Sequence, residues 1–127
     1  MSRILIIDDS SFQRGMVRRI VQESGYETIE ASNGKDGLAM IDSEDIDCIL
    51  LDLVMPEMTG VEVLEQLQAQ HCSVPVIVVS ADIQESTHDI CRQLGALSII
   101  NKPVKKNELN TVLTEALGDK AEVSDVT

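Results

Sequence analysis

The chain has 127 residues, enough for one domain with one hydrophobic core and too few for two ordinary domains. Hydrophobic residues make up 43% of the sequence, which predicts a packed globule, and aromatic residues only 2%, which disfavours stacking on nucleobases or flavins. The formal net charge of −12 repels phosphate backbones and anionic lipid, so binding to nucleic acid or to a membrane is not expected.

Three cysteines, Cys48, Cys72 and Cys91, stand far apart and lack the close Cys/His spacing of a zinc site. An odd number of cysteines fits a reducing cytoplasm better than a disulfide framework. The sequence shows no apolar stretch long enough to cross a bilayer, and its first residues do not resemble a signal peptide. These features predict a cytoplasmic protein.

Short apolar runs rich in β-branched residues alternate along the chain with segments of helical period. In chain order we expect a strand at Ile4–Ile7, a helix at about 10–24, a strand at Tyr26–Ala31, a helix at 34–43, a strand at Ile49–Leu51, a helix at 60–70, a strand at Val74–Val79, a helix at 83–94, a strand at Leu97–Ile100 and a helix at 106–117. Five strand–helix repeats predict an α/β fold with an open, doubly wound parallel sheet and helices on both faces.

Local signals support the expected helices. In the first helix, apolar residues recur at steps of three and four, which predicts one buried face: Phe12, Met16, Val17, Ile20 and Val21. Gly25 follows as a helix stop. Thr59 with Glu62 has the spacing of a capping box, and Asp82 with Glu85 is a similar start signal.

The last residues, 119–127, lack any such period and are expected to form a short, acidic, flexible tail. Residues 1–118 are then a single domain. The sequence shows no internal linker, so we expect no fused output domain.

Polar residues follow four of the five expected strands: Asp8 and Asp9 the first, Asp52 the third, Ser80 the fourth, and Asn101 and Lys102 the fifth, where Pro103 comes next. Each alone has an ordinary structural explanation as a cap, a structural hydroxyl or a solvated charge. In a doubly wound sheet, however, ligands bind at the carboxyl ends of the strands. The coincidence therefore predicts one functional site.

Three crowded carboxylates repel one another, and a hard cation with oxygen ligands relieves that repulsion. Mg²⁺ suits such a site because it accepts a few carboxylates and keeps waters for a phosphoryl oxygen. Lys102 adds a fixed positive charge and Ser80 a hydroxyl donor. The set predicts a place where a phosphoryl group is neutralised and held in line with the carboxylate of Asp52.

The chain resembles the receiver domains of two-component response regulators, of which the CheY-like proteins are the stand-alone form. The resemblance covers about residues 3–118 and rests on an ordered set of motifs: Ile7–Asp8–Asp9–Ser10, the segment from Leu51 to Gly60 around Asp52, Val79–Ser80–Ala81, Leu94–Gly95–Ala96 and Asn101–Lys102–Pro103. It implies a flavodoxin-like (βα)5 fold with five parallel strands in the order 2-1-3-4-5.

The resemblance also implies that Asp52 takes a phosphoryl group from a phosphohistidine of a sensor histidine kinase, or from a small acyl phosphate. Asp9 and Asp52 bind Mg²⁺ directly in this scheme, Asp8 mostly through water, and the backbone carbonyl of Val54 completes the protein ligands. The chain is then a phosphoacceptor that catalyses its own phosphorylation and slow dephosphorylation, not an enzyme with other substrates.

By the same resemblance, Lys102 pairs with the phosphoryl group, Ser80 turns toward it as part of the switch, and the Lys102–Pro103 bond is cis. One position departs from the family pattern. Three residues before the lysine, where many members carry Tyr or Phe, this chain has Ile99. We expect Ile99 to make a packing contact, which puts an aromatic toggle in doubt but leaves phosphorylation untouched.

Partners implied by the resemblance are a sensor histidine kinase and an unidentified target protein, in chemotaxis or another pathway. The segment Val79–Gln84 also resembles stand-alone receivers associated with CheC- or CheX-like phosphatases. A role as phosphorelay intermediate or phosphate sink stays open, as does a binding module that acts without phosphorylation. An aspartyl phosphatase is disfavoured because the first acids are adjacent rather than in a DxD pattern.

Overall fold

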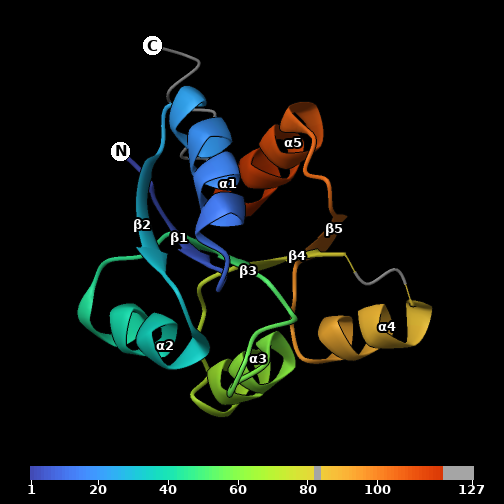
Figure 1. Cartoon of the computed structure of the whole chain (residues 1–127). Coiled ribbons are helices and arrows are strands. Elements are labelled where there is room, and N and C mark those ends of the chain that lie inside the picture. The colour runs from blue at the N-terminus through green and yellow to red at the C-terminus, as the bar shows by residue number, and fades with distance from the viewer. Residues whose placement is uncertain (82–83, 119–127) are drawn as a thin grey trace.

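Five strands and five helices alternate along the computed structural model, which describes residues 1–81 and 84–118 (Figure 1). Their bounds are β1 Arg3–Ile7, α1 Ser11–Glu23, β2 Glu27–Ala31, α2 Gly34–Ser43, β3 Cys48–Leu51, α3 Gly60–Ala69, β4 Val76–Ser80, α4 Glu85–Gln93, β5 Ser98–Asn101 and α5 Lys106–Leu117. The strands form one parallel sheet in the order β2-β1-β3-β4-β5. The predicted fold class and strand order are confirmed.

The sheet is covered on both faces, with α1 and α5 on one side and α2, α3 and α4 on the other (Figure 1). Side chains alternate along each strand, so Leu5 and Ile7 pack toward α2–α4, whereas Ile4 and Ile6 pack toward α1 and α5. Cys48 belongs to the core between the sheet and helices α1 and α5, and burial raises the pKa of its thiol to about 12. It therefore behaves as a small buried apolar residue.

Each strand differs from its expected bounds by one or two residues, and the largest difference is at the fourth strand. The fourth strand was expected at Val74–Val79 but begins at Val76, because Pro75 has no N–H to donate to the ladder. At its other end, β4 includes Ser80, which pairs with Asn101 of β5 instead of following the strand. The helix start signal at Asp82 lies outside the described residues, and α4 begins at Glu85.

The buried face of α1 is narrower than expected. Val17 and Val21 are buried, but Phe12 is 72% and Met16 38% exposed. Steps of four residues overshoot the helical turn of 3.6, so a stripe through Phe12 and Met16 drifts around the helix. Phe12 precedes Val21 by about two and a half turns and so lies on the opposite side.

The loop after β3 is pinned close to the sheet. The backbone N–H of Asp52 donates to Ile7 O at 2.9 Å, and that of Gly60 donates to Leu53 O at 2.9 Å. Thr59 and Glu62 form the predicted capping box at the start of α3. A Cβ on Gly60 would lie 2.4 Å from the backbone oxygen of Asp52 and 2.7 Å from Leu53 Cα. The backbone that carries Asp52 therefore requires glycine at position 60.

We expect Gly60→Ala to destabilise the fold by about 2 kcal/mol, since the clashing atoms belong to backbone that cannot move aside. Gly15→Ala is the matched control, because its Cβ would meet only Arg18 Nη2, at 3.6 Å, inside α1. That change should stabilise the helix by up to about 1 kcal/mol. Urea denaturation measures both. A Gly60→Ala protein as stable as the parent would show that this close approach is unimportant.

Candidate functional site

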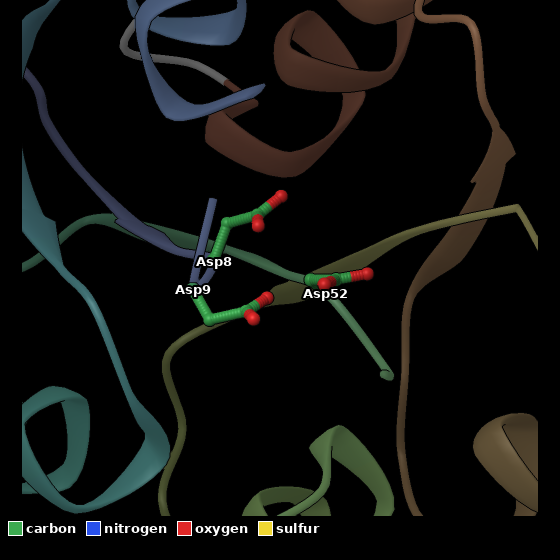
Figure 2. Close-up of side chains that lie close together, drawn as sticks. All are labelled: Asp8, Asp9 and Asp52. Carbon is green, nitrogen blue, oxygen red and sulfur yellow. The ribbon is translucent and has the colours of Figure 1, made fainter. Parts of the chain in front are cut away.

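Three carboxylates meet at the carboxyl edge of the sheet (Figure 2). Ile7 pairs with Leu51 in the β1–β3 ladder. Asp8 and Asp52 are the first residues after these two strands, so they lie side by side. Each of Asp8, Asp9 and Asp52 offers a carboxylate oxygen, and these atoms all lie within 4.8 Å of one another. Asp8 and Asp52 are buried, whereas Asp9 is exposed. The cluster is therefore shielded from solvent at Asp8 and Asp52 and accessible to solvent at Asp9.

Lys102 reaches this cluster from β5. Its Nζ lies 3.2 Å from Asp8 Oδ2 and 3.3 Å from Asp52 Oδ1. Its backbone N–H donates to Ser80 O at 2.8 Å, and the Lys102–Pro103 peptide bond is cis. One ammonium thus bridges two buried carboxylates that would otherwise repel each other.

One lysine does not fully offset this crowding. Burial, followed by the negative charge of Asp8, raises the pKa of Asp52 above its usual value of 3.8, although Lys102 acts in the opposite direction. The folded chain thus binds this proton more readily than the unfolded chain does. Folding is then favoured at low pH, and that contribution is lost as the pH rises through the raised pKa. Ionised Asp52 therefore destabilises the metal-free fold at neutral pH.

We expect Asp52→Asn to stabilise the metal-free protein at pH 7 by about 1 kcal/mol. The gain should shrink as the pH falls toward 3.8, because the parent carboxyl then takes up its proton. Urea denaturation at a series of pH values measures the difference. A variant less stable than the parent at pH 7 would contradict the sign.

Glu30→Gln is a control of opposite sign. Burial acts to raise the pKa of Glu30, but hydrogen bonds from Arg18 and Arg14 outweigh it and hold the pKa below 4.5. A depressed pKa contributes stability above the unfolded value and loses it as the pH falls. Glu30→Gln should therefore destabilise the fold at pH 7 and approach the parent in acid.

Three other predicted site residues come from β4, β5 and the loop after β3. Ser80 is fully buried at the end of β4. Val54 is 72% exposed, and its backbone N–H donates to the carboxylate of Asp52. Ile99, on β5, is half-buried against the core under α2–α4 and supplies packing rather than a polar group. The structure thus brings the acids and Lys102 into contact and leaves Ile99 in the hydrophobic layer.

Two further contacts to Asp8 were not foreseen. The backbone N–H of Ser10 donates to Asp8 Oδ1 at 2.9 Å, and Arg14 Nη1 donates to the backbone oxygen of Asp8 at 2.6 Å. Ser10 also caps α1, since its Oγ accepts from the Gln13 N–H at 3.2 Å. A helix that begins directly after an acidic strand end indicates that its first turn lies near the site, but it does not indicate which side chain of the helix contacts Asp8.

The donor set suits Mg²⁺. It consists of carboxylate oxygens only, within reach of one ion, with Asp9 on the solvent side where waters can remain. Asp8, Asp9 and Asp52 are therefore the side chains that would hold the ion.

Comparison with known proteins agrees with this geometry. A family model described as the response regulator receiver domain matches residues 4–114. Protein PilH of Pseudomonas aeruginosa is 33% identical over 119 residues, which cover 92% of this chain and 98% of that protein. Chemotaxis protein CheY of Listeria monocytogenes is 36% identical over 117 residues, covering 91% and 98%.

A solved structure shows the same likeness in three dimensions. The CheY-like receiver domain protein from Methanospirillum hungatei superposes with a TM-score of 0.87 at 29% identity, covering 96% of this chain and 98% of that one. The chain is thus a signalling domain with the CheY fold, and it belongs to the response regulator receiver domain family of two-component systems. Among its described helices, none has the length and apolar character needed to span a membrane.

Proposed function

We propose that the chain is a phosphorylation-dependent switch in which Asp52 accepts a phosphoryl group, with Mg²⁺ bound by Asp8, Asp9, Asp52 and the backbone carbonyl of Val54. The observation that carries the proposal is the bridge from Lys102 to the buried Asp8 and Asp52. Such a bridge keeps a carboxylate ionised in a buried place and provides a cation for the charge that arrives with phosphate.

In the proposed reaction, a carboxylate oxygen of Asp52 attacks the phosphorus of a phosphohistidine or a small acyl phosphate. A new O–P bond forms and makes Asp52 an acyl phosphate. The P–N or P–O bond of the donor breaks, and its electron pair leaves with the imidazole or the carboxylate. Bound Mg²⁺ supplies positive charge to the phosphoryl oxygens. Lys102 Nζ, which lies 3.3 Å from Asp52 Oδ1, then forms an ion pair with the new phosphoryl group in place of its contact with the Asp52 carboxylate.

Ser80 and Lys102 are the residues through which the proposed change reaches the rest of the domain. Ser80 has a hydroxyl that can donate to the phosphoryl group, and its backbone oxygen already holds the N–H of Lys102. Both belong to the β4–β5 side of the sheet, next to α4 and α5 (Figure 1). Exposed Ile90 and Leu97 on that side offer apolar surface for a target protein.

The lifetime of the phosphate depends on how well a water is positioned beside Asp52. Val54, two residues further on, is 72% exposed, and its side chain has neither a donor nor an acceptor for that water. If phosphate is lost slowly from Asp52, a separate phosphatase is needed to end the signal. We propose that a CheC- or CheX-like phosphatase is a partner of this chain. Residues 82 and 83 of the segment that suggested this partner lie outside the described residues.

We expect the protein to gain the mass of one phosphoryl group when it is mixed with acetyl phosphate and Mg²⁺, and not when EDTA replaces the metal. Asp52→Asn should gain none under either condition, because the nucleophile is gone. Asp89→Asn is the control, since Asp89 is exposed on α4 and, among the residues that the structure describes, pairs with Arg92 alone. Intact-mass spectrometry measures all three. An Asp52→Asn protein that still gains the same mass would overturn the assignment.

Asp9→Ala tests the proposed metal site separately. We expect the metal-free variant to be about 1 kcal/mol more stable than the parent, because one of three repelling charges is removed. Its melting temperature should no longer rise with Mg²⁺, because that rise requires Mg²⁺ to bind the folded protein and not the unfolded chain. Full Mg²⁺-dependent stabilisation of Asp9→Ala in thermal melts would show that Asp9 is not a ligand.

A further inference from the structure

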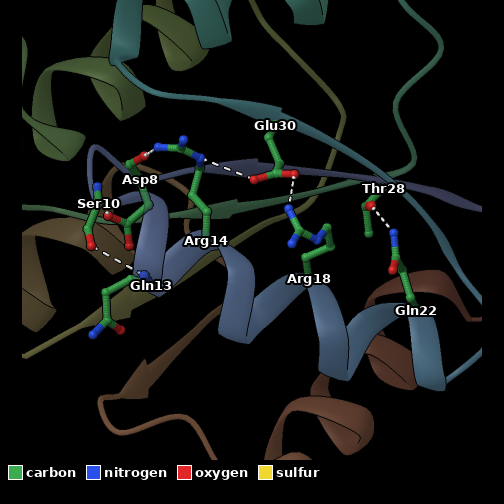
Figure 3. Close-up of polar contacts among 8 residues, drawn as sticks. All are labelled: Asp8, Ser10, Gln13, Arg14, Arg18, Gln22, Thr28 and Glu30. Atoms are coloured by element: carbon green, nitrogen blue, oxygen red, sulfur yellow. Dashed lines mark hydrogen bonds and ion pairs between the residues drawn. The ribbon is translucent and has the colours of Figure 1, made fainter.

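Arg14 lies on α1 with its side chain only 16% exposed, and it joins three elements (Figure 3). Its Nη1 donates to the backbone oxygen of Asp8 at 2.6 Å, and its Nε donates to Glu30 Oε1 at 3.2 Å. Asp8 follows β1 and Glu30 belongs to β2. The guanidinium therefore fills the gap between the start of α1 and two strand ends.

The oxygen that Arg14 holds belongs to the peptide that joins Asp8 to Asp9. Asp8 has other anchors, since its N–H donates to Ala31 O at 3.2 Å and its carboxylate meets Lys102. Among the described residues, the carboxylate of Asp9 makes no hydrogen bond or ion pair that would hold it. The direction of the Asp9 side chain thus depends on the orientation of the preceding peptide, and Arg14 restrains that orientation.

Arg14 is itself held in place. Glu30 accepts from Arg14 through Oε1 and from Arg18 Nη1 through Oε2 at 2.8 Å (Figure 3). A planar guanidinium can direct Nε to one acceptor and Nη1 to another, whereas a lysine ammonium lacks this fixed fork. The contact to the Asp8 oxygen is therefore a directed one, built from two strands and a helix.

We propose that Arg14 is a positioning residue for the acidic cluster, which holds the Asp8–Asp9 peptide so that both carboxylates face one shared cation. This rests on the proposed Mg²⁺ site. A simple charge effect predicts the opposite sign, because a guanidinium near the cluster repels a divalent cation and its removal would tighten binding. The two explanations therefore separate in one measurement.

The test is the Mg²⁺ affinity of the unphosphorylated protein, from the rise of melting temperature with Mg²⁺ and from calorimetric titration. We expect Arg14→Met to weaken Mg²⁺ binding about tenfold, as for other residues that orient a metal ligand. Arg14→Lys keeps the charge without the fork, so it should also bind more weakly than the parent, with partial recovery relative to Arg14→Met. Phosphorylation by acetyl phosphate should approach the parent rate at saturating Mg²⁺.

Arg18→Met is the matched control, since Arg18 contacts the same Glu30 from the same helix but does not touch Asp8. It should leave Mg²⁺ affinity within about twofold of the parent, because the ligand peptide keeps its restraint. Unchanged or tighter binding by Arg14→Met and by Arg14→Lys would overturn the proposal while the Mg²⁺ site stands. A parent protein that binds no Mg²⁺ would instead overturn the site itself, and the role of Arg14 with it.

Discussion

Two buried carboxylates, on Asp8 and Asp52, share a single lysine at the edge of the sheet, and the rest of the site depends on this imbalance of charge. One ammonium cannot neutralise two carboxylates. Burial raises the pKa of Asp52, the negative charge of Asp8 raises it further, and Lys102 offsets only part of this, so the metal-free site lacks positive charge. A divalent cation or an additional proton makes up that deficit. The same imbalance explains why such a place favours metal binding and why it carries a stability penalty without metal.

The surrounding structure keeps these groups from moving apart. The N–H of Asp52 is bonded to Ile7, and Gly60 allows the following loop to lie against the backbone of Asp52. On the other strand, Asp8 is bonded through its N–H, its carboxylate and its backbone oxygen. Asp9 alone projects into solvent. The site therefore combines a rigid buried pair with one exposed ligand.

The strand order and the cluster of acids at the sheet edge could be predicted from the sequence. Continuous apolar runs identify buried parallel strands, and polar residues at the carboxyl ends of such strands lie at one edge of the sheet. The exposure of Phe12 could not be predicted, because the packing of α1 on the sheet decides which of its apolar residues are buried. Nor could the contact of Arg14 with Asp8 be predicted, because an arginine on a helix surface usually points to water. Its partners come from two other elements whose spacing only the folded chain sets.

The wholly parallel sheet has a kinetic consequence. A parallel ladder cannot close through a short hairpin, and Lys102 and Asp8, which are 94 residues apart in the chain, meet only when β1, β3, β4 and β5 are aligned. A growing polypeptide shorter than residue 102 lacks the bridging cation altogether. The bridged site can thus form only after residue 102 has been added to the chain, and shorter chains cannot assemble it.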